Sequence, residues 1–130
     1  MLVLDSNVAI RAAAADDGFV EFGREELVAP ALLWFEFRSS LHEAVRRGAA
    51  SERHALETLR RLADAPLRPR SHPRLGETAW KISNEFGWAK TYDAEYVALA
   101  QLLGCRVVTL DARLRHGADR LGFVIDPSEL

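Results

Sequence analysis

The sequence is poor in cysteine and lysine and has no long apolar run, and each shortage excludes a class of protein. Cys105 is the single cysteine among 130 residues, so no intramolecular disulfide can form and a reducing compartment suits the chain. No apolar stretch is long enough to cross a bilayer. The opening residues, MLVLDSNV, lack the basic segment and apolar run of a signal peptide and read instead as a strand. We therefore expect a cytoplasmic protein with no membrane part.

Recognisable zinc motifs are missing as well. The four histidines show no HExxH spacing, and one cysteine cannot build a cysteine-rich zinc site. The scarcity of lysine leaves 15 arginines to carry most of the positive charge, against 19 acids and a net charge of −2. By itself this balance argues against a polyanionic partner such as nucleic acid.

Apolar runs typical of short strands alternate with segments of helical periodicity along the whole chain. Strands are expected within residues 2–5, 26–30, 105–111 and 123–125, with a short edge strand within 66–73. Helices are expected from residue 6, from residue 51, and over 30–48, 75–87, 91–104 and 112–122. Pro30, Gly48, Ser51 and Thr91 suit the ends of these helices. This alternation, without linkers or repeats, predicts an α/β fold with a mostly parallel central sheet flanked by helices, in one domain over residues 1–130.

Glu36 is the one acid in the apolar stretch ALLWFEFRSSL, residues 31–41. A helix that is apolar nearly all round its first turns is expected to be buried. A carboxylate in such surroundings is costly unless it is paired, hydrogen-bonded or bound to a metal ion. Glu36 is therefore a candidate functional residue, and an ion pair with Arg38 or Arg11 is the structural alternative.

Three further acids lie where parallel sheets commonly bind ligands. Asp5 ends the first expected strand and Asp111 ends RVVTLD, and ligands bind outside the carboxyl ends of such strands. Asp93 lies in the first turn of the helix expected from Thr91. Each of these three could instead cap a helix or balance its dipole. Together with Glu36 they would repel one another unless a cation compensates, and oxygen ligands alone select Mg²⁺ or Mn²⁺ over zinc.

Four segments, VLDSNV, FEFRSSL, TYDAEYVALA and VVTLDARL, resemble in this order and spacing the motifs of the PIN-domain ribonucleases. More narrowly, the chain is similar to the VapC toxins of bacterial toxin–antitoxin pairs, over essentially its whole length. The resemblance implies a PIN-like fold and metal-dependent endonucleolytic cleavage of RNA. In that family the acids matching Asp5, Glu36, Asp93 and Asp111 form the metal site.

The resemblance also implies partners and supporting residues. Asn7 and Thr109 match the family's small polar residues that hold the carboxylates in place. Toxins of this kind form homodimers and are silenced by a small antitoxin of the VapB type. Setting the four site acids aside leaves 15 acids against 17 basic residues, so phosphate binding is allowed, and Arg113, Arg115 and Lys90 are the best candidates for the RNA backbone.

Within the metal site, Asp5 and Asp93 are expected to be the central ligands. Asp111 would complete the shell directly or through water, and Glu36 would bind a second ion or orient the attacking water. Two other classes of function stay open. An aspartyl phosphatase would use Asp5 as nucleophile but commonly has a second aspartate where this chain has Asn7. A non-catalytic signalling or interaction domain would leave Glu36 unexplained.

Overall fold

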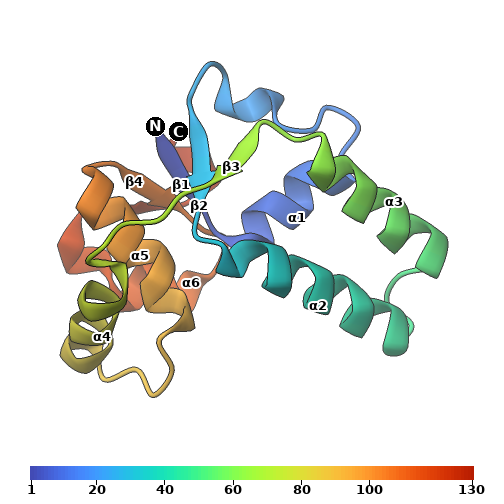
Figure 1. Ribbon diagram of the computed structural model, residues 1–130. Helices are drawn as coiled ribbons and strands as arrows, with labels where there is room; N and C mark the ends of the chain where they lie inside the picture. The colour runs from blue at the N-terminus through green and yellow to red at the C-terminus, as the bar shows by residue number, and fades with distance from the viewer.

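The computed structural model describes residues 1–130, and a five-stranded sheet in the order β3-β2-β1-β4-β5 forms its centre (Figure 1). All four strand pairings are parallel, which confirms the predicted parallel sheet. The short edge strand expected within residues 66–73 is β3. The strands are β1 (Leu2–Leu4), β2 (Leu27–Ala29), β3 (Leu67–Pro69), β4 (Arg106–Val108) and β5 (Val124–Ile125).

Six α-helices connect and cover these strands, and each overlaps a segment that the apolar periodicity predicts. They are α1 (Ser6–Ala14), α2 (Leu32–Arg46), α3 (Glu52–Ala63), α4 (Leu75–Phe86), α5 (Tyr92–Leu103) and α6 (Ala112–Gly117). Single 3₁₀ turns occur at Val20–Phe22, Asp119–Leu121 and Pro127–Glu129. In Figure 1, α1, α2 and α3 contact one another on one side of the molecule. Helices α4 and α5 pack together on the other side, with α5 against β1 and β4. No helix is both long and apolar enough to span a membrane.

The order of the strands creates a crevice beside the first strand. The chain proceeds outward from β1 through β2 to β3, and then returns past β1 to β4 and β5. The direction of winding therefore reverses between β1 and β4, and ligands of open parallel sheets bind at such a reversal, outside the carboxyl ends of the strands. Leu4 pairs with Val108 in the sheet, so Asp5 and Thr109 leave the two strands side by side.

Most helix ends follow the local sequence, with two exceptions. Pro30, expected at the first position of its helix, lies outside α2, which begins at Leu32 with Ala31 as its N-cap. The Ser51 hydroxyl accepts a hydrogen bond from the His54 N–H at 3.1 Å and caps α3 as predicted. Gly104 ends α5 with φ 67°, a left-handed conformation that a side chain would disfavour. The predicted cap at Thr91 is wrong: its side chain makes no capping hydrogen bond. The backbone of Thr91 (φ −92°, ψ −2°) is already near-helical, so it lacks the extended conformation that aims a cap side chain at the free N–H groups.

One hydrophobic core joins the two sides of the molecule. The valines Val3, Val28 and Val107 on the central strands are fully buried, as parallel strands covered on both faces should be. Phe37 from α2 and Leu99 from α5 enter the same core with no exposed surface. Both helices that carry candidate acids are therefore fixed by packing.

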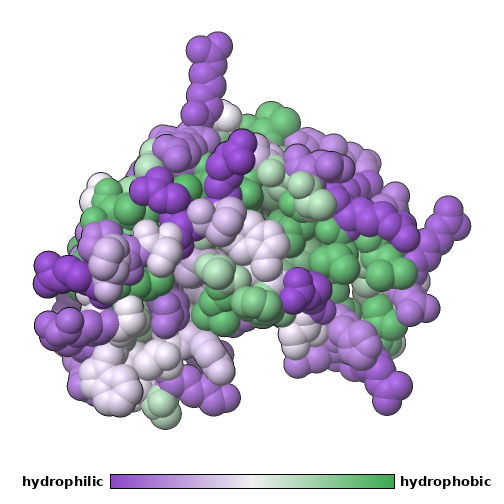
Figure 2. All heavy atoms as spheres, viewed as in Figure 1, coloured by the Kyte–Doolittle hydropathy of each residue, from purple (hydrophilic) through white to green (hydrophobic).

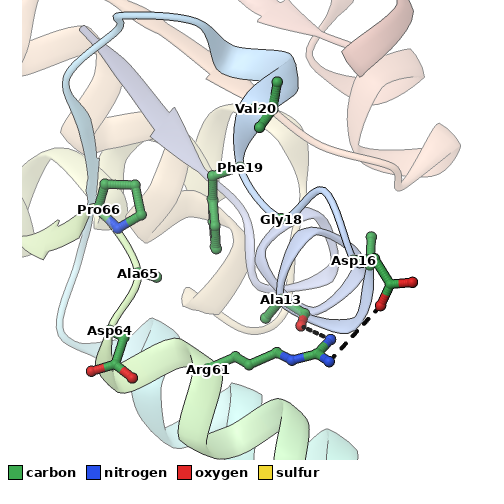
Figure 3. A pocket seen from close by; sticks show the side chains of 10 residues that line it. Ala13, Asp16, Gly18, Phe19, Val20, Arg61, Asp64, Ala65 and Pro66 are labelled. Atoms are coloured by element: carbon green, nitrogen blue, oxygen red, sulfur yellow. Dashed lines mark hydrogen bonds and ion pairs between the residues drawn. The ribbon is translucent and has the colours of Figure 1, made fainter.

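The C-terminal end of α1 is tied to α3 by an arginine, at a hollow of about 490 Å³ (Figure 3). The Arg61 guanidinium donates to the carbonyl oxygens of Ala13 and Ala14, each at 3.3 Å. These carbonyls lack partners within the helix, and a cation there also opposes the negative end of the helix dipole. The hollow lies away from the four candidate acids, and its polar groups serve this structural contact.

Candidate active site

Asp5 lies at the base of the crevice, in the turn from β1 into α1. Its Oδ1 accepts from the Ser6 N–H at 2.7 Å, and its Oδ2 accepts from the Thr109 hydroxyl at 2.7 Å. The side chain is almost fully buried. Burial raises the pKa of Asp5 to about 6, against the lowering effect of these two hydrogen bonds, and the negative charges of Asp93 and Glu36 raise it further. Asp5 therefore caps α1. Its ionised form is unfavourable in these surroundings, and a bound cation would stabilise it.

Asp93 faces the same crevice from the first turn of α5. Loss of water around its carboxyl group and repulsion by Asp111 raise its pKa, while the Arg113 guanidinium lowers it. Asp111 follows β4, where its Oδ1 accepts from the N–H groups of Arg113 and Leu114 at 2.9 and 3.3 Å. The cap that the sequence allowed for Asp111 is thus present, and its second carboxylate oxygen accepts no hydrogen bond from the protein.

Glu36 is half-buried on α2, and neither arginine considered as its partner reaches it. Arg38 lies over the ring of Phe35 at 5.2 Å, and Arg11 pairs with Glu21. The carboxylate instead accepts a hydrogen bond from the hydroxyl of Tyr96. Burial raises the pKa of Glu36 despite this bond, and repulsion by Asp93 adds to the effect. The structural alternative of an ion pair is therefore wrong.

Mutual repulsion shows which of the predicted acids the fold brings together. Asp5, Glu36 and Asp93 act on one another electrostatically, and Asp111 acts on Asp93. The cluster is not a closed coordination shell, because no group of three or more histidine, cysteine, aspartate or glutamate side chains lies in metal-holding geometry. The donors are nevertheless chemically suited to a hard divalent ion, since all are carboxylates and three have raised pKa values.

The two predicted supporting residues make different contacts. Thr109 is fully buried; its hydroxyl donates to Asp5 and accepts from the Asp111 N–H at 3.0 Å, so one oxygen links two acids. The Asn7 side chain makes no hydrogen bond to any of the acids. Its Oδ1 accepts from the Leu110 N–H at 3.1 Å and so ties the start of α1 to the loop that carries Asp111.

The three candidate RNA-binding residues also differ. Arg113 is 96% exposed and lies 3.8 Å from Asp111, so its guanidinium is free to meet a phosphate at the rim of the crevice. Arg115 turns away and pairs with Asp126 and Glu129 near the C-terminus. Lys90 is exposed and forms no ion pair. The structure thus keeps Arg113 beside the acids and places Arg115 in a structural contact.

Comparison with known proteins shows the relationship that the acids suggest. The family model of the PIN domain matches residues 2–119. The chain belongs to the PIN-domain family. Ribonuclease VapC9 of Mycobacterium tuberculosis and VapC ribonuclease Mb0985 of Mycobacterium bovis are each 39% identical to it over 121 residues, with 88% of both chains covered. Among PIN domains it is accordingly of the VapC type.

Solved structures agree on the fold of this PIN domain. The crystal structure of PAE2754 from Pyrobaculum aerophilum has a TM-score of 0.71 at 26% identity and covers 98% of this chain and 91% of its own. A structure described as a toxin–antitoxin complex from Klebsiella pneumoniae has a TM-score of 0.67 at 17% identity, with 98% of each chain covered. At that identity, the second likeness shows the fold alone.

Two hollows lie along the elements that carry the acids of the PIN domain. One, of about 290 Å³, is lined by Trp88, Asp93, Asp111, Arg113 and Leu114. The other, of about 300 Å³, lies between the start of α1 and α2, over Ser6, Asn7 and the small residue Ser40, with Arg47 at its edge. The first hollow therefore gives open space beside Asp93 and Asp111, with Arg113 on its wall, and the second is lined by none of the four acids.

Sequence reasoning missed one residue of the PIN-domain site, Tyr96. Tyr96 is fully buried on α5. The hydroxyl that ends in the crevice is invisible to a local sequence pattern, because its partner Glu36 lies 60 residues away. The available signal was chemical: a buried tyrosine hydroxyl needs a hydrogen-bond partner, and Glu36 was the buried acid without one.

Proposed function

We propose that this PIN domain is a metal-dependent endoribonuclease and the toxin of a toxin–antitoxin pair, formed by residues 1–130 and acting in the cytoplasm. The observation that carries the proposal is the cluster of Asp5, Glu36 and Asp93, whose pKa values burial and mutual repulsion raise, at the point where the strand order reverses. The names of the VapC relatives, which are ribonucleases, support it.

The chain's own residues divide the work of hydrolysing a phosphodiester. Asp5 and Asp93, with Asp111, would hold Mg²⁺ or Mn²⁺, and Glu36 would hold a second ion or orient the attacking water. Such an ion supplies charge neutralisation at the phosphoryl group and a more acidic bound water. Thr109 keeps the Asp5 carboxylate oriented, and Asn7 keeps the loop after β4 in place.

Binding of the RNA backbone rests on a different set of side chains. Arg113 contacts a phosphate next to the acids, since its guanidinium is exposed and lies beside Asp111 and Asp93. Lys90, in the loop before α5, is free for a second phosphate. The phosphatase alternative loses support because Asn7 is engaged in holding a loop rather than placed to transfer a proton.

An antitoxin of the VapB type is the proposed partner, and the protein is proposed to be a homodimer. A groove of about 780 Å³ between α2 and α3 has apolar side chains, among them Phe35, Leu41 and Leu56, beside polar ones such as Arg38 and Glu52. Figure 2 shows apolar surface over these two helices. Phe35 and Trp80 are more than 60% exposed, whereas Phe37 is buried, so part of the aromatic content is surface that a partner could cover.

The test is cleavage of a labelled RNA by the purified protein with Mn²⁺ and with a chelator. We expect cleavage that stops on chelation and is lost in Asp93→Asn. Glu95→Gln is the matched control: Glu95 lies in the same turn of α5, burial raises its pKa too, and it is outside the cluster. Equal cleavage by wild type and Asp93→Asn would contradict the proposal. Absence of Mn²⁺ binding at millimolar concentration would favour an interaction domain.

A further inference from the structure

We propose that Tyr96 is a positioning residue of this site: its hydroxyl holds one oxygen of Glu36 so that the other faces the crevice. The inference rests on the proposed metal-dependent nuclease and adds to it a residue from α5 that contacts neither substrate nor metal. It is carried by the hydrogen bond from the Tyr96 hydroxyl to Glu36 Oε1, and by the way the two helices are packed.

Tyr96 is rigidly held. It has no exposed surface, and it lies one turn after Asp93 on a helix whose next residues Val97 and Leu99 are also fully buried. Helix α5 packs against β1 and β4, the strands that precede Asp5 and Asp111. The phenol ring is therefore anchored to the same framework as the three aspartates, and its hydroxyl has a fixed position relative to them.

Glu36 comes from the other side of the molecule and needs this contact. It sits on α2, which packs mainly with α1 and α3, whereas Tyr96 sits on α5, which packs mainly with α4, β1 and β4. No cation reaches its carboxylate, and the Tyr96 hydroxyl is the one group that donates to it. A glutamate has three rotatable side-chain bonds, and without this donor its carboxylate would be free to leave the crevice.

The Tyr96 hydroxyl is suited to act as a hydrogen-bond donor to the Glu36 carboxylate. A phenol is protonated at neutral pH, and the Tyr96 hydroxyl donates its hydrogen to Glu36 Oε1. A buried donor left without an acceptor is costly, so Tyr96 and Glu36 stabilise each other's position. Glu36 Oε2 has no hydrogen-bond partner in the protein and is left for a ligand of the crevice.

A cycle of Tyr96→Phe, Glu36→Gln and the double variant tests the inference, because phenylalanine keeps the packing and removes only the hydroxyl. Mn²⁺ affinity is measured by titration calorimetry, kcat and KM with a labelled RNA, and Tm in chelator. We expect Tyr96→Phe to weaken Mn²⁺ binding or lower kcat by about 10–100-fold, with KM within about twofold, as for supports of metal ligands. In the Glu36→Gln background, where cleavage is already lost, the same change should weaken Mn²⁺ binding no further.

Tyr92→Phe is the matched control, since Tyr92 lies one turn earlier on α5, is 54% exposed and makes no hydrogen bond to the acids. It should leave Mn²⁺ affinity and kcat unchanged. A Tyr96→Phe protein that binds Mn²⁺ and cleaves RNA like wild type would overturn the inference, and so would an equal loss with and without Glu36. Failure of Tyr96→Phe to fold would also overturn it, because the hydroxyl would then be structural. A wild type that neither binds Mn²⁺ nor cleaves RNA would instead overturn the proposed function itself.

Discussion

Replacing Asp5 by asparagine should stabilise the metal-free protein at neutral pH while abolishing its activity. Asp5 is buried, and its pKa in the folded protein is about 6 in place of 3.8. A group whose pKa rises on folding binds its proton more tightly in the folded state. Its contribution to stability is therefore complete below about pH 4 and is lost as the pH rises through about 6.

The magnitude follows from this difference in pKa. At 1.36 kcal/mol for each pH unit, ionised Asp5 lowers the free energy of unfolding at pH 8 by about 3 kcal/mol. Asparagine removes the charge and still offers an oxygen to Ser6 or to Thr109, but not to both, which costs about 1 kcal/mol. The net expectation for Asp5→Asn in chelator at pH 8 is a gain of about 1–2 kcal/mol.

Urea unfolding followed by circular dichroism, in chelator at pH 4, 6 and 8, measures this directly. The wild type should lose stability between pH 4 and 8, and Asp5→Asn should lose less. Added Mn²⁺ should raise the stability of the wild type more than that of the variant, because a ligand stabilises only the state that binds it. A decrease of about 1 kcal/mol or more in the free energy of unfolding for Asp5→Asn at pH 8, on the order of one hydrogen bond, would refute the reasoning. The Asp5 carboxylate would then stabilise the fold as a helix cap more than its buried charge destabilises it.

Three more substitutions have expected outcomes. Glu36→Gln should abolish RNA cleavage with stability kept or raised, because no cation pairs with Glu36, and a thermal melt beside the cleavage assay checks both; an unfolded variant would show a structural role. Thr109→Val should lower the free energy of unfolding by about 1–3 kcal/mol, since it removes both the donor to Asp5 and the acceptor for the next turn, and an unchanged urea midpoint would speak against this. Arg113→Ala should change stability by less than about 0.5 kcal/mol but raise KM for RNA and weaken its salt dependence, and a salt-independent KM in wild type would argue against phosphate contact.

The fold was predictable because its signals are local. The run LVLD predicts the first strand, Ser51 the start of a helix and Gly104 the end of another. The structure has β1, the start of α3 and the end of α5 at these positions. The alternation of strands and helices then permits few topologies. Thr91 shows the limit of such local signals: it holds the N-cap position of α5, yet its backbone is near-helical and its side chain makes no capping hydrogen bond.

The candidate site was predictable in part. Acids at strand ends, such as Asp5 and Asp111, can be found from the sequence because parallel strands bring their carboxyl ends to one edge. The arginines could not be distinguished in this way. Arg113 and Arg115 are two residues apart on a short helix, yet one is exposed beside the acids and the other pairs with Asp126. Only the path of the C-terminal segment decides which of them is free.

The sequence by itself determined the order of the elements, the family and the four acids, because these depend on residue type and short-range spacing. The tertiary structure alone decided how the acids are held. The buried tyrosine that contacts Glu36 comes from another helix on the far side of the crevice, and the threonine that contacts Asp5 comes from the neighbouring strand 104 residues away. Such contacts join segments that no local pattern relates, and they exist only once both sides of the sheet are packed.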